Sequence, residues 1–209
     1  MEEEFHNHMR IPWHDYTRKS IGRPITEASL SEKASIIGRT GIMLLSCGTG
    51  AWRVRSSMNT LARELGITCT ADIGLLSIEY TCIDGGDCYT ESLCLFNTGV
   101  NTSKLYRMEL FVNKFATNCK KMSGDELHTL LDQIHEIHGF YSPPFLGLAA
   151  AVACCAFTFL LGGGPTEMFC AFLGAGAGNF LRAKMNQHHL TLFLCTAASV
   201  ALACIVYTI

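Results

Sequence analysis

One carboxylate stands alone in the last third of the chain. Glu167 is the only acidic residue in 143–209, and an ionisable group in an apolar segment costs enough free energy that it suggests a proton relay or an ion site. A carboxylate in the first turn of a helix is also stabilised by the helix dipole, so interfacial capping is the alternative. Gly162, Gly163 and Gly164 lie just before it, and a glycine-rich break between apolar segments can expose backbone groups to a substrate. We therefore predict that these four residues bind substrate or couple it to protons.

The same segment offers groups for helix packing, recognition and orientation. Asn179 can hydrogen-bond between helices or contact a substrate. Three small residues at every second position would let helix backbones approach closely. They are Gly174, Gly176 and Gly178. Arg182 and Lys184 are the only cations of the segment, and we predict that they are topology anchors, because cations mark the cytoplasmic ends of membrane helices.

Histidines and an aspartate on one predicted helix form the pattern closest to a metal site. His128, Asp132 and His135 fall on one side of a helical wheel, with His138 following. Two histidines and one aspartate lack the fourth ligand of a stable zinc site, so we favour a solvated flank beside the apolar stripe. The sequence also carries no signature of a catalytic triad or a kinase. We expect no metal, no cofactor and no enzymatic activity.

The elements that must position these groups follow from an uneven distribution of charge. The chain has 209 residues, of which 49% are hydrophobic and only 16% are charged, whereas average globular proteins have about 25% charged residues. Residues 1–142 hold 31 of the 34 charged side chains, and residues 143–209 hold three. A net charge of −2 offers no basic patch for nucleic acid. The sequence therefore predicts a water-facing part followed by a membrane part.

Three apolar segments of the second part are predicted to be transmembrane helices, because a bilayer core about 30 Å thick needs roughly 20 apolar residues. They lie near 144–161, 167–181 and 190–209. The cations between the second and third segments predict that this loop lies in the cytoplasm. The turn between the first and second segments is then outside, and residues 1–142, before the first segment, lie in the cytoplasm. The acidic start of the chain lacks the apolar core of a signal peptide. We expect a multi-pass protein of the cell (plasma or inner) membrane.

The first part is predicted to be an α+β cytoplasmic domain over 29–142, preceded by a flexible N-terminal arm over 1–28. A capping box from Ser29 to Glu32 marks the first helix start. Apolar periodicity predicts four helices, near 30–47, 51–65, 100–121 and 123–137. Between them, residues 67–96 alternate with a period of two, and their Gly-Gly turn predicts a β-hairpin. The eleven cysteines are expected to be reduced packing residues.

Three stretches resemble one known family. The run from Gly41 to Arg55, GIMLLSCGTGAWRVR, continues through Leu61–Ile67 and resembles the opening of the threonine/serine exporter family. The helix 125–137 that leads into an apolar segment, and Leu160–Gly164 that closes that segment, are similar as well. The order and spacing of these elements resemble the family over residues 29–209.

The resemblance implies a cytoplasmic domain followed by two sets of membrane helices, in one chain or in two, and export of threonine and serine driven by the proton gradient. Because three predicted spans are fewer than a full set, we predict that this chain does not transport alone. We expect it to work with the remaining transporter helices or a second membrane subunit, as an oligomer in membrane lipid. Two alternatives stay open: half of a two-component dicarboxylate (succinate) exporter, and a membrane-tethered regulatory or interaction module.

Overall fold

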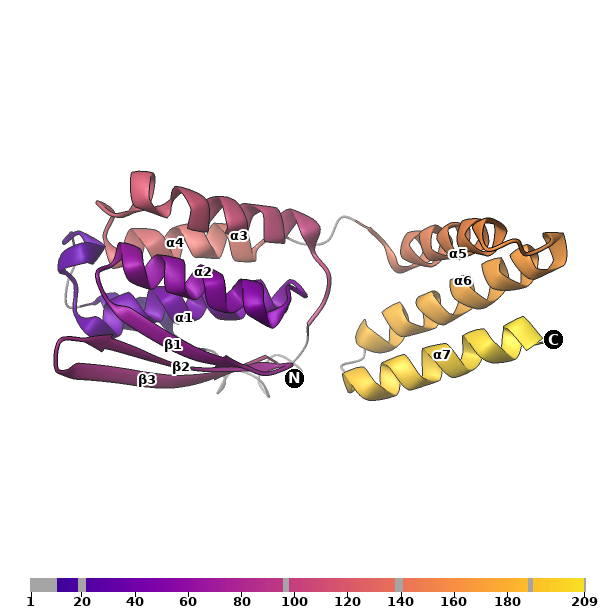
Figure 1. Ribbon diagram of the computed structural model, residues 1–209, viewed down its shortest axis with the longest axis horizontal. Helices are drawn as coiled ribbons and strands as arrows, with labels where there is room; N and C mark the ends of the chain where they lie inside the picture. The colour runs from indigo at the N-terminus through magenta and orange to yellow at the C-terminus, as the bar shows by residue number, and fades with distance from the viewer. Residues whose placement is uncertain (1–10, 19–21, 96–97, 138–140, 188–189, 209) are drawn as a thin grey trace. The chain divides into compact units, whose positions relative to one another are not determined.

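The computed structural model describes residues 11–18, 22–95, 98–137, 141–187 and 190–208. The chain divides into two compact units, Met1–Gly139 and Phe140–Ile209, and each is described by itself. The first unit combines helices with a small sheet, and the second consists of helices (Figure 1).

Helix α1, Leu30–Ser46, is the centre of the first unit. The predicted capping box is confirmed, because Ser29 accepts a hydrogen bond from the backbone N–H of Glu32 and the Glu32 carboxylate accepts one from the backbone N–H of Ser29. Nearly every residue of α1 is buried, including Ile36 and Leu44, which have no exposed surface. A helix that is buried all round must be covered by other elements on opposite sides.

Three antiparallel strands form a sheet in the order β1-β2-β3. They are β1, Thr68–Ile73, β2, Ser77–Asp84, and β3, Asp87–Cys94. The predicted hairpin is confirmed, because Asp84 pairs with Asp87 across a two-residue turn in which Gly85 has a φ of +61°. The sheet packs on α1 through β2 and β3. Tyr80 and its inward-facing neighbours are buried there, and the alternate residues of β2 and β3 are more exposed.

Three further helices complete the first unit. They are α2, Ala51–Glu64, α3, Thr102–Lys114, and α4, Gly124–His135, with a π-helical turn over Phe115–Cys119 after α3. Helices α1 and α2 form a layer between the sheet and the layer of α3 and α4 (Figure 1). Apolar side chains between the layers, such as Met58, Met108 and Leu127, are fully buried.

Part of the segment predicted as a flexible arm is docked on the first unit. Two 3₁₀ helices, η2, Trp13–Thr17, and η3, Ile25–Glu27, lie against α1, and η2 also lies against α4. Thr17 and Ile25 are buried, and the Ile25 N–H donates to the Met122 carbonyl over 2.8 Å. Single side chains anchor these residues, and single anchors leave no periodic pattern in the sequence. Residues 1–10 and 19–21 of the predicted arm lie outside the described residues.

The second unit contains α5, Pro143–Leu160, α6, Pro165–Gln187, and α7, Leu192–Thr208. Helix α6 packs on both of its neighbours. A Cβ added at Gly174 would lie 2.8 Å from the Ala203 carbonyl oxygen of α7, and one added at Gly176 would lie 3.2 Å from the Ala151 Cβ of α5. Glycines on different sides of α6 therefore face the two neighbouring helices.

The fold class predicted for this unit, three transmembrane helices, is wrong. Among the residues that the structure describes, no helix combines the length and the apolarity that a bilayer crossing requires. Helices α5 and α7 have 18 and 17 residues, which rise about 27 and 26 Å against a hydrocarbon core of about 30 Å. Helix α6 has 23 residues but includes Glu167, Arg182 and Lys184. The bounds of the predicted spans therefore differ from those of the helices. The predicted span 167–181 is shorter than α6 and lies inside it, and residues 190–191 of the third predicted span precede α7.

Candidate functional site

A small pocket lies between α6 and α7 in the second unit. Each helix contributes four residues spaced i, i+3, i+4 and i+7, which places the four on one helix face. They are Ala175, Gly178, Asn179 and Arg182 from α6 and Thr196, Ser199, Val200 and Ala203 from α7. The pocket has a volume of about 160 Å³, below the roughly 300–1,000 Å³ of sites for drug-sized ligands. Its size therefore fits a small metabolite.

Gly178 sets the distance between the two helices at this pocket. A Cβ added there would lie 2.8 Å from the Ser199 carbonyl oxygen and 3.1 Å from the Ala203 Cβ, so a larger residue would push α7 away. Ser199 is buried, and its hydroxyl donates to the Thr196 carbonyl over 2.9 Å. Since that bond uses its proton, the Ser199 hydroxyl oxygen is left as an acceptor.

Asn179 and Arg182 are the polar groups that α6 contributes. Both residues are exposed. The only acidic side chain in 143–209, Glu167, lies 15 residues before Arg182 on the same helix, a rise of about 22 Å. The guanidinium therefore has no carboxylate side chain of its own unit to pair with. An arginine fork binds a carboxylate with two parallel hydrogen bonds, so this group could hold an anionic ligand.

The other residues predicted to bind substrate lie at the opposite end of α6. Gly162, with a φ of +88°, and Gly163 and Gly164 form the turn between α5 and α6. Glu167 is exposed in the first turn of α6, and its Oε2 lies 2.8 Å from where a Gly164 Cβ would be. Because 12 residues separate Glu167 from Asn179, the helix rise puts them about 18 Å apart. The structure brings Gly178, Asn179 and Arg182 together and leaves this turn outside the pocket.

Two pocket residues, Thr196 and Ser199, were missed by the sequence analysis. Their signal is a pair of hydroxyls three residues apart in an otherwise apolar segment. Lys184 does not line the pocket, although we predicted the same anchor role for it as for Arg182. Both cations lie within α6 and not in the predicted loop after it.

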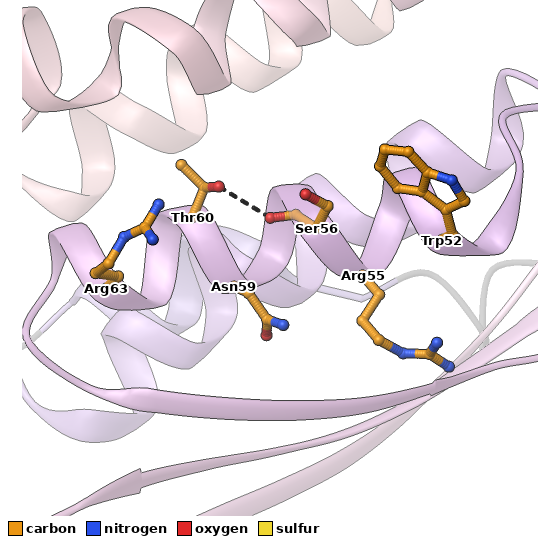
Figure 2. A pocket seen from close by; sticks show the side chains of 6 residues that line it. All are labelled: Trp52, Arg55, Ser56, Asn59, Thr60 and Arg63. Atoms are coloured by element: carbon orange, nitrogen blue, oxygen red, sulfur yellow. Dashed lines mark hydrogen bonds between the residues drawn. The ribbon is translucent and has the colours of Figure 1, made fainter.

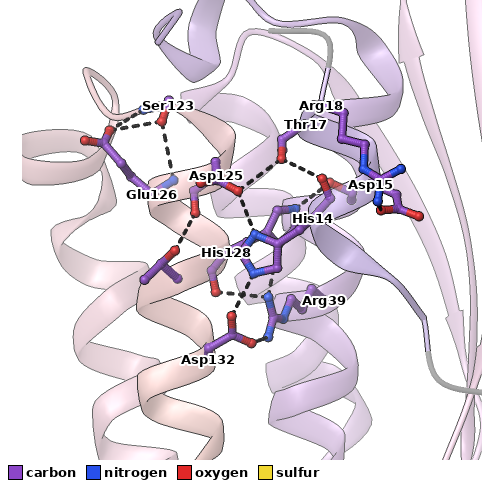
Figure 3. Close-up of polar contacts among 12 residues, drawn as sticks. His14, Asp15, Thr17, Arg18, Arg39, Ser123, Asp125, Glu126, His128 and Asp132 are labelled. Atoms are coloured by element: carbon purple, nitrogen blue, oxygen red, sulfur yellow. Dashed lines mark hydrogen bonds and ion pairs between the residues drawn. The ribbon is translucent and has the colours of Figure 1, made fainter. Parts of the chain in front are cut away.

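A cluster of polar side chains connects η2 with α1 and α4 through hydrogen bonds and ion pairs (Figure 3). His14 lies between two carboxylates of α4: its Nδ1 is 2.6 Å from Asp125 and its Nε2 is 2.8 Å from Asp132. The hydrogen bonds to Asp125 and Asp132 raise the pKa of His14. Asp132 also pairs with Arg39 of α1, whose guanidinium lies 5.7 Å from the Trp13 ring. The cluster thus joins three segments that are far apart in the sequence.

His128 lies within this cluster and has no exposed surface. Arg39 donates to its Nδ1 over 3.2 Å, so the ring proton is assigned to Nε2, which lies 3.1 Å from the Ser35 hydroxyl. Burial, followed by the charge of Arg39, lowers the pKa of His128 to about 3. The predicted solvated flank is therefore wrong for His128, because α1 and η2 cover it. His138 lies outside the described residues.

An open groove runs along the outer face of α2 (Figure 2). It has a volume of about 350 Å³ and is lined by Trp52, Arg55, Ser56, Asn59, Thr60 and Arg63. The Arg55 Nε donates to the Ala71 carbonyl over 3.0 Å, and the Thr60 hydroxyl donates to the Ser56 carbonyl over 2.9 Å. All six lining residues of the groove belong to one helix, whereas two helices line the α6–α7 pocket.

These observations narrow the class of protein. The second unit exposes large apolar side chains, which mark contact with other molecules, and it holds a small polar pocket between two helices. A family model described as "Putative threonine/serine exporter" matches residues 35–209, and the chain belongs to that family. The match includes α2 to α7 and most of α1.

The comparison confirms the family that the sequence resembles. It places the chain in a family of transport proteins, which implies a membrane protein. No curated protein and no solved structure matches the chain.

Proposed function

We propose that this chain works in an exporter of threonine and serine that is driven by the proton gradient. The observation that carries the proposal is the family match over residues 35–209, which takes in both units. The α6–α7 pocket supports it, because its volume of about 160 Å³ and its mixed amide, hydroxyl and guanidinium lining suit a small zwitterion.

The surroundings of the second unit belong to the same proposal. Its large apolar side chains are unusually exposed, with Leu161 at 87%, Phe193 at 76% and Phe157 at 65%. Many exposed large apolar side chains on one unit indicate contact with lipid or with other protein. We place it against membrane lipid and the remaining transporter helices or a second membrane subunit, in an oligomer of the cell (plasma or inner) membrane.

The first unit is assigned to the cytoplasmic side. All eleven cysteines of the chain are unpaired, six of them in this unit. Cys69 and Cys82 are even directly opposite each other on β1 and β2 without being joined. Free thiols are typical of a reducing compartment, which supports this orientation.

Deleting the gene for this chain is expected to slow threonine efflux from the native cell, and re-expression is expected to restore it. Cells would be loaded with labelled threonine through a threonine-containing dipeptide, and efflux would be followed over time. An uncoupler that collapses the proton gradient should abolish the restored part, because that gradient supplies the energy. Vesicles that hold this chain alone are expected not to transport. Unchanged efflux after deletion would contradict the proposed function.

Replacing Glu167 by glutamine tests the proton coupling. Gln has nearly the same shape but cannot titrate, so E167Q is expected to lower the coupled efflux by about tenfold or more, because positioned acid–base groups contribute at least that much. The pH dependence of efflux should flatten as well. Lys184→Gln is the matched control, since Lys184 is a charged residue of α6 that does not line the pocket. If E167Q keeps the wild-type rate and pH profile, Glu167 acts only as a helix-capping carboxylate.

A further inference from the structure

We infer that Arg182 binds the α-carboxylate of the exported amino acid in the α6–α7 pocket, with the ammonium and the side chain of the ligand directed to Ser199, Asn179 and Thr196. This inference rests on the proposed function, because it names the site of the same substrate. It changes the expected role of Arg182 from a topology anchor to a binding residue.

The charge of the pocket suits a ligand with one carboxylate. Among the residues that the structure describes, Arg182 is the only charged residue that lines the pocket, and no acidic residue lines it. The nearest acidic side chain in the sequence of this unit, Glu167, is about 22 Å away along α6. A guanidinium has five N–H donors and no acceptor, so the remaining site is complementary to one carboxylate. A dicarboxylate would leave its second charge without a cation in this lining.

The hydrogen-bond acceptors of the pocket suit the ammonium group of the ligand. The Ser199 hydroxyl donates its proton to the Thr196 carbonyl over 2.9 Å, so its oxygen can only accept from a ligand. The Asn179 amide offers a carbonyl oxygen as well as an NH₂ group. One donor-only cation facing neutral acceptors is the arrangement that a zwitterionic α-amino acid needs, since its carboxylate accepts and its ammonium donates.

The walls of the pocket suit a short side chain. Ala175, Val200 and Ala203 are small or β-branched and apolar, so they can contact a methyl group. The volume of about 160 Å³ is below the roughly 300–1,000 Å³ of sites for drug-sized ligands. Gly178 adds no side chain, and a Cβ there would lie 2.8 Å from the Ser199 carbonyl oxygen, so the two helices approach closely beside the pocket and keep it small. The site therefore favours amino acids with short side chains such as threonine and serine.

The test is equilibrium binding of labelled threonine to the full chain, purified from its native membrane with any subunits that accompany it. Arg182→Gln is expected to weaken threonine binding by about ten- to a hundredfold, the range for a lost charge-assisted hydrogen-bonded contact. Threoninamide, which lacks the carboxylate, should bind weakly and equally to wild type and R182Q. Lys184→Gln should leave both ligands unchanged, and succinate should not compete.

Arg182→Lys separates recognition from anchoring. Lysine keeps the positive charge but loses the planar fork, so a membrane anchor would tolerate it whereas a bidentate carboxylate contact would not. We expect R182K to bind threonine at least about fivefold more weakly than wild type. If R182Q does not fold, R182K and the comparison of threonine with threoninamide in the wild type decide the question.

The outcomes distinguish this inference from the proposed function. If the wild type binds threonine but R182Q and R182K bind it equally well, Arg182 is not the carboxylate contact and the export function stands. If threoninamide binds the wild type as tightly as threonine, the carboxylate is not recognised and the inference fails in the same way. If the wild-type assembly binds neither threonine nor serine, the proposed function itself is overturned.

Discussion

Lowering the pH from 7 to 4 is expected to destabilise the first unit by about 3 kcal/mol through His128 alone, because its pKa falls from the usual 6.5 to about 3 on folding. The unfolded chain binds a proton at His128 below pH 6.5, whereas the folded chain does not until about pH 3. Stability from this residue is therefore fully present above pH 6.5 and decreases as the pH falls toward 3.

The contacts of His128 explain why it stays neutral. Its Nδ1 accepts from Arg39, so a proton placed there would point at a guanidinium. Trp13 stacks over the ring at 6.0 Å, and the His14 ring lies 5.7 Å away, so no water reaches it from the side of η2. The carboxylates of Asp125 and Asp132 act in the opposite direction, but burial and Arg39 outweigh them.

His14 makes the first unit more stable in acid, which is opposite to the effect of His128, and its contribution to stability is smaller. Because its pKa is raised on folding, it contributes stability at low pH that is lost as the pH rises through its folded pKa. Its side chain is 46% exposed, so solvent screens its pairs with Asp125 and Asp132. The net result is a unit that loosens in acid, with His128 as the main cause.

Urea unfolding at pH 7 and pH 4 measures the effect of His128. Trp13 fluorescence reports on η2 and the His128 ring directly when Trp52, which is exposed, is replaced by phenylalanine. His128→Gln can still accept from Arg39 and donate to Ser35 but cannot titrate, so it should remove most of the pH dependence. His135→Gln, an exposed position on the same helix, should not. Equal pH dependence in wild type and H128Q would contradict this account.

Gly38→Ala is expected to destabilise the first unit by about 3 kcal/mol, the upper range for overpacking a well-packed core. A Cβ at Gly38 would overlap the ring and hydroxyl of Tyr80. Tyr80 is 1% exposed, and its hydroxyl lies 2.6 Å from the Glu91 carboxylate and 3.1 Å from the Ala34 carbonyl oxygen, so it has no room to move. The gain in helix propensity from Gly to Ala, about 1 kcal/mol, is too small to compensate.

Gly41→Ala, one turn later on α1, is the matched control. A Cβ at Gly41 would meet the Met58 Sδ at 2.6 Å and the Ile78 Cδ1 at 3.3 Å. Methionine is unbranched and adapts to new contacts, so G41A should cost at least about 1 kcal/mol less than G38A. The measurement is the urea midpoint of each variant at pH 7. If G38A is as stable as G41A, the Tyr80 ring is not fixed as the structure shows.

The candidate site shows where sequence reasoning reached its limit. Gly178, Asn179 and Arg182 all stand out in the sequence, but for separate roles in packing, recognition and orientation. Thr196 and Ser199 have only a weak signal, a pair of hydroxyls three residues apart, because hydroxyls are common in apolar helices. Glu167 stands out most clearly and lies about 18 Å along α6 from Asn179.

The sequence by itself determined what depends on neighbours along the chain. The capping box at Ser29, the Gly85 hairpin turn, the order of the four helices and the hairpin in the first unit, and the family are all readable from short patterns, because caps, turns and periodicity act over a few residues. The third strand, β1, was not predicted separately. Tertiary structure alone decided the burial of His128, the docking of η2 and the pocket between α6 and α7. Each of these depends on which helix faces meet, and close contacts such as that between Gly178 and the Ser199 carbonyl set this. It also decided that none of the described helices can cross a membrane, since hydropathy measures how apolar a run is but not where its helix begins and ends.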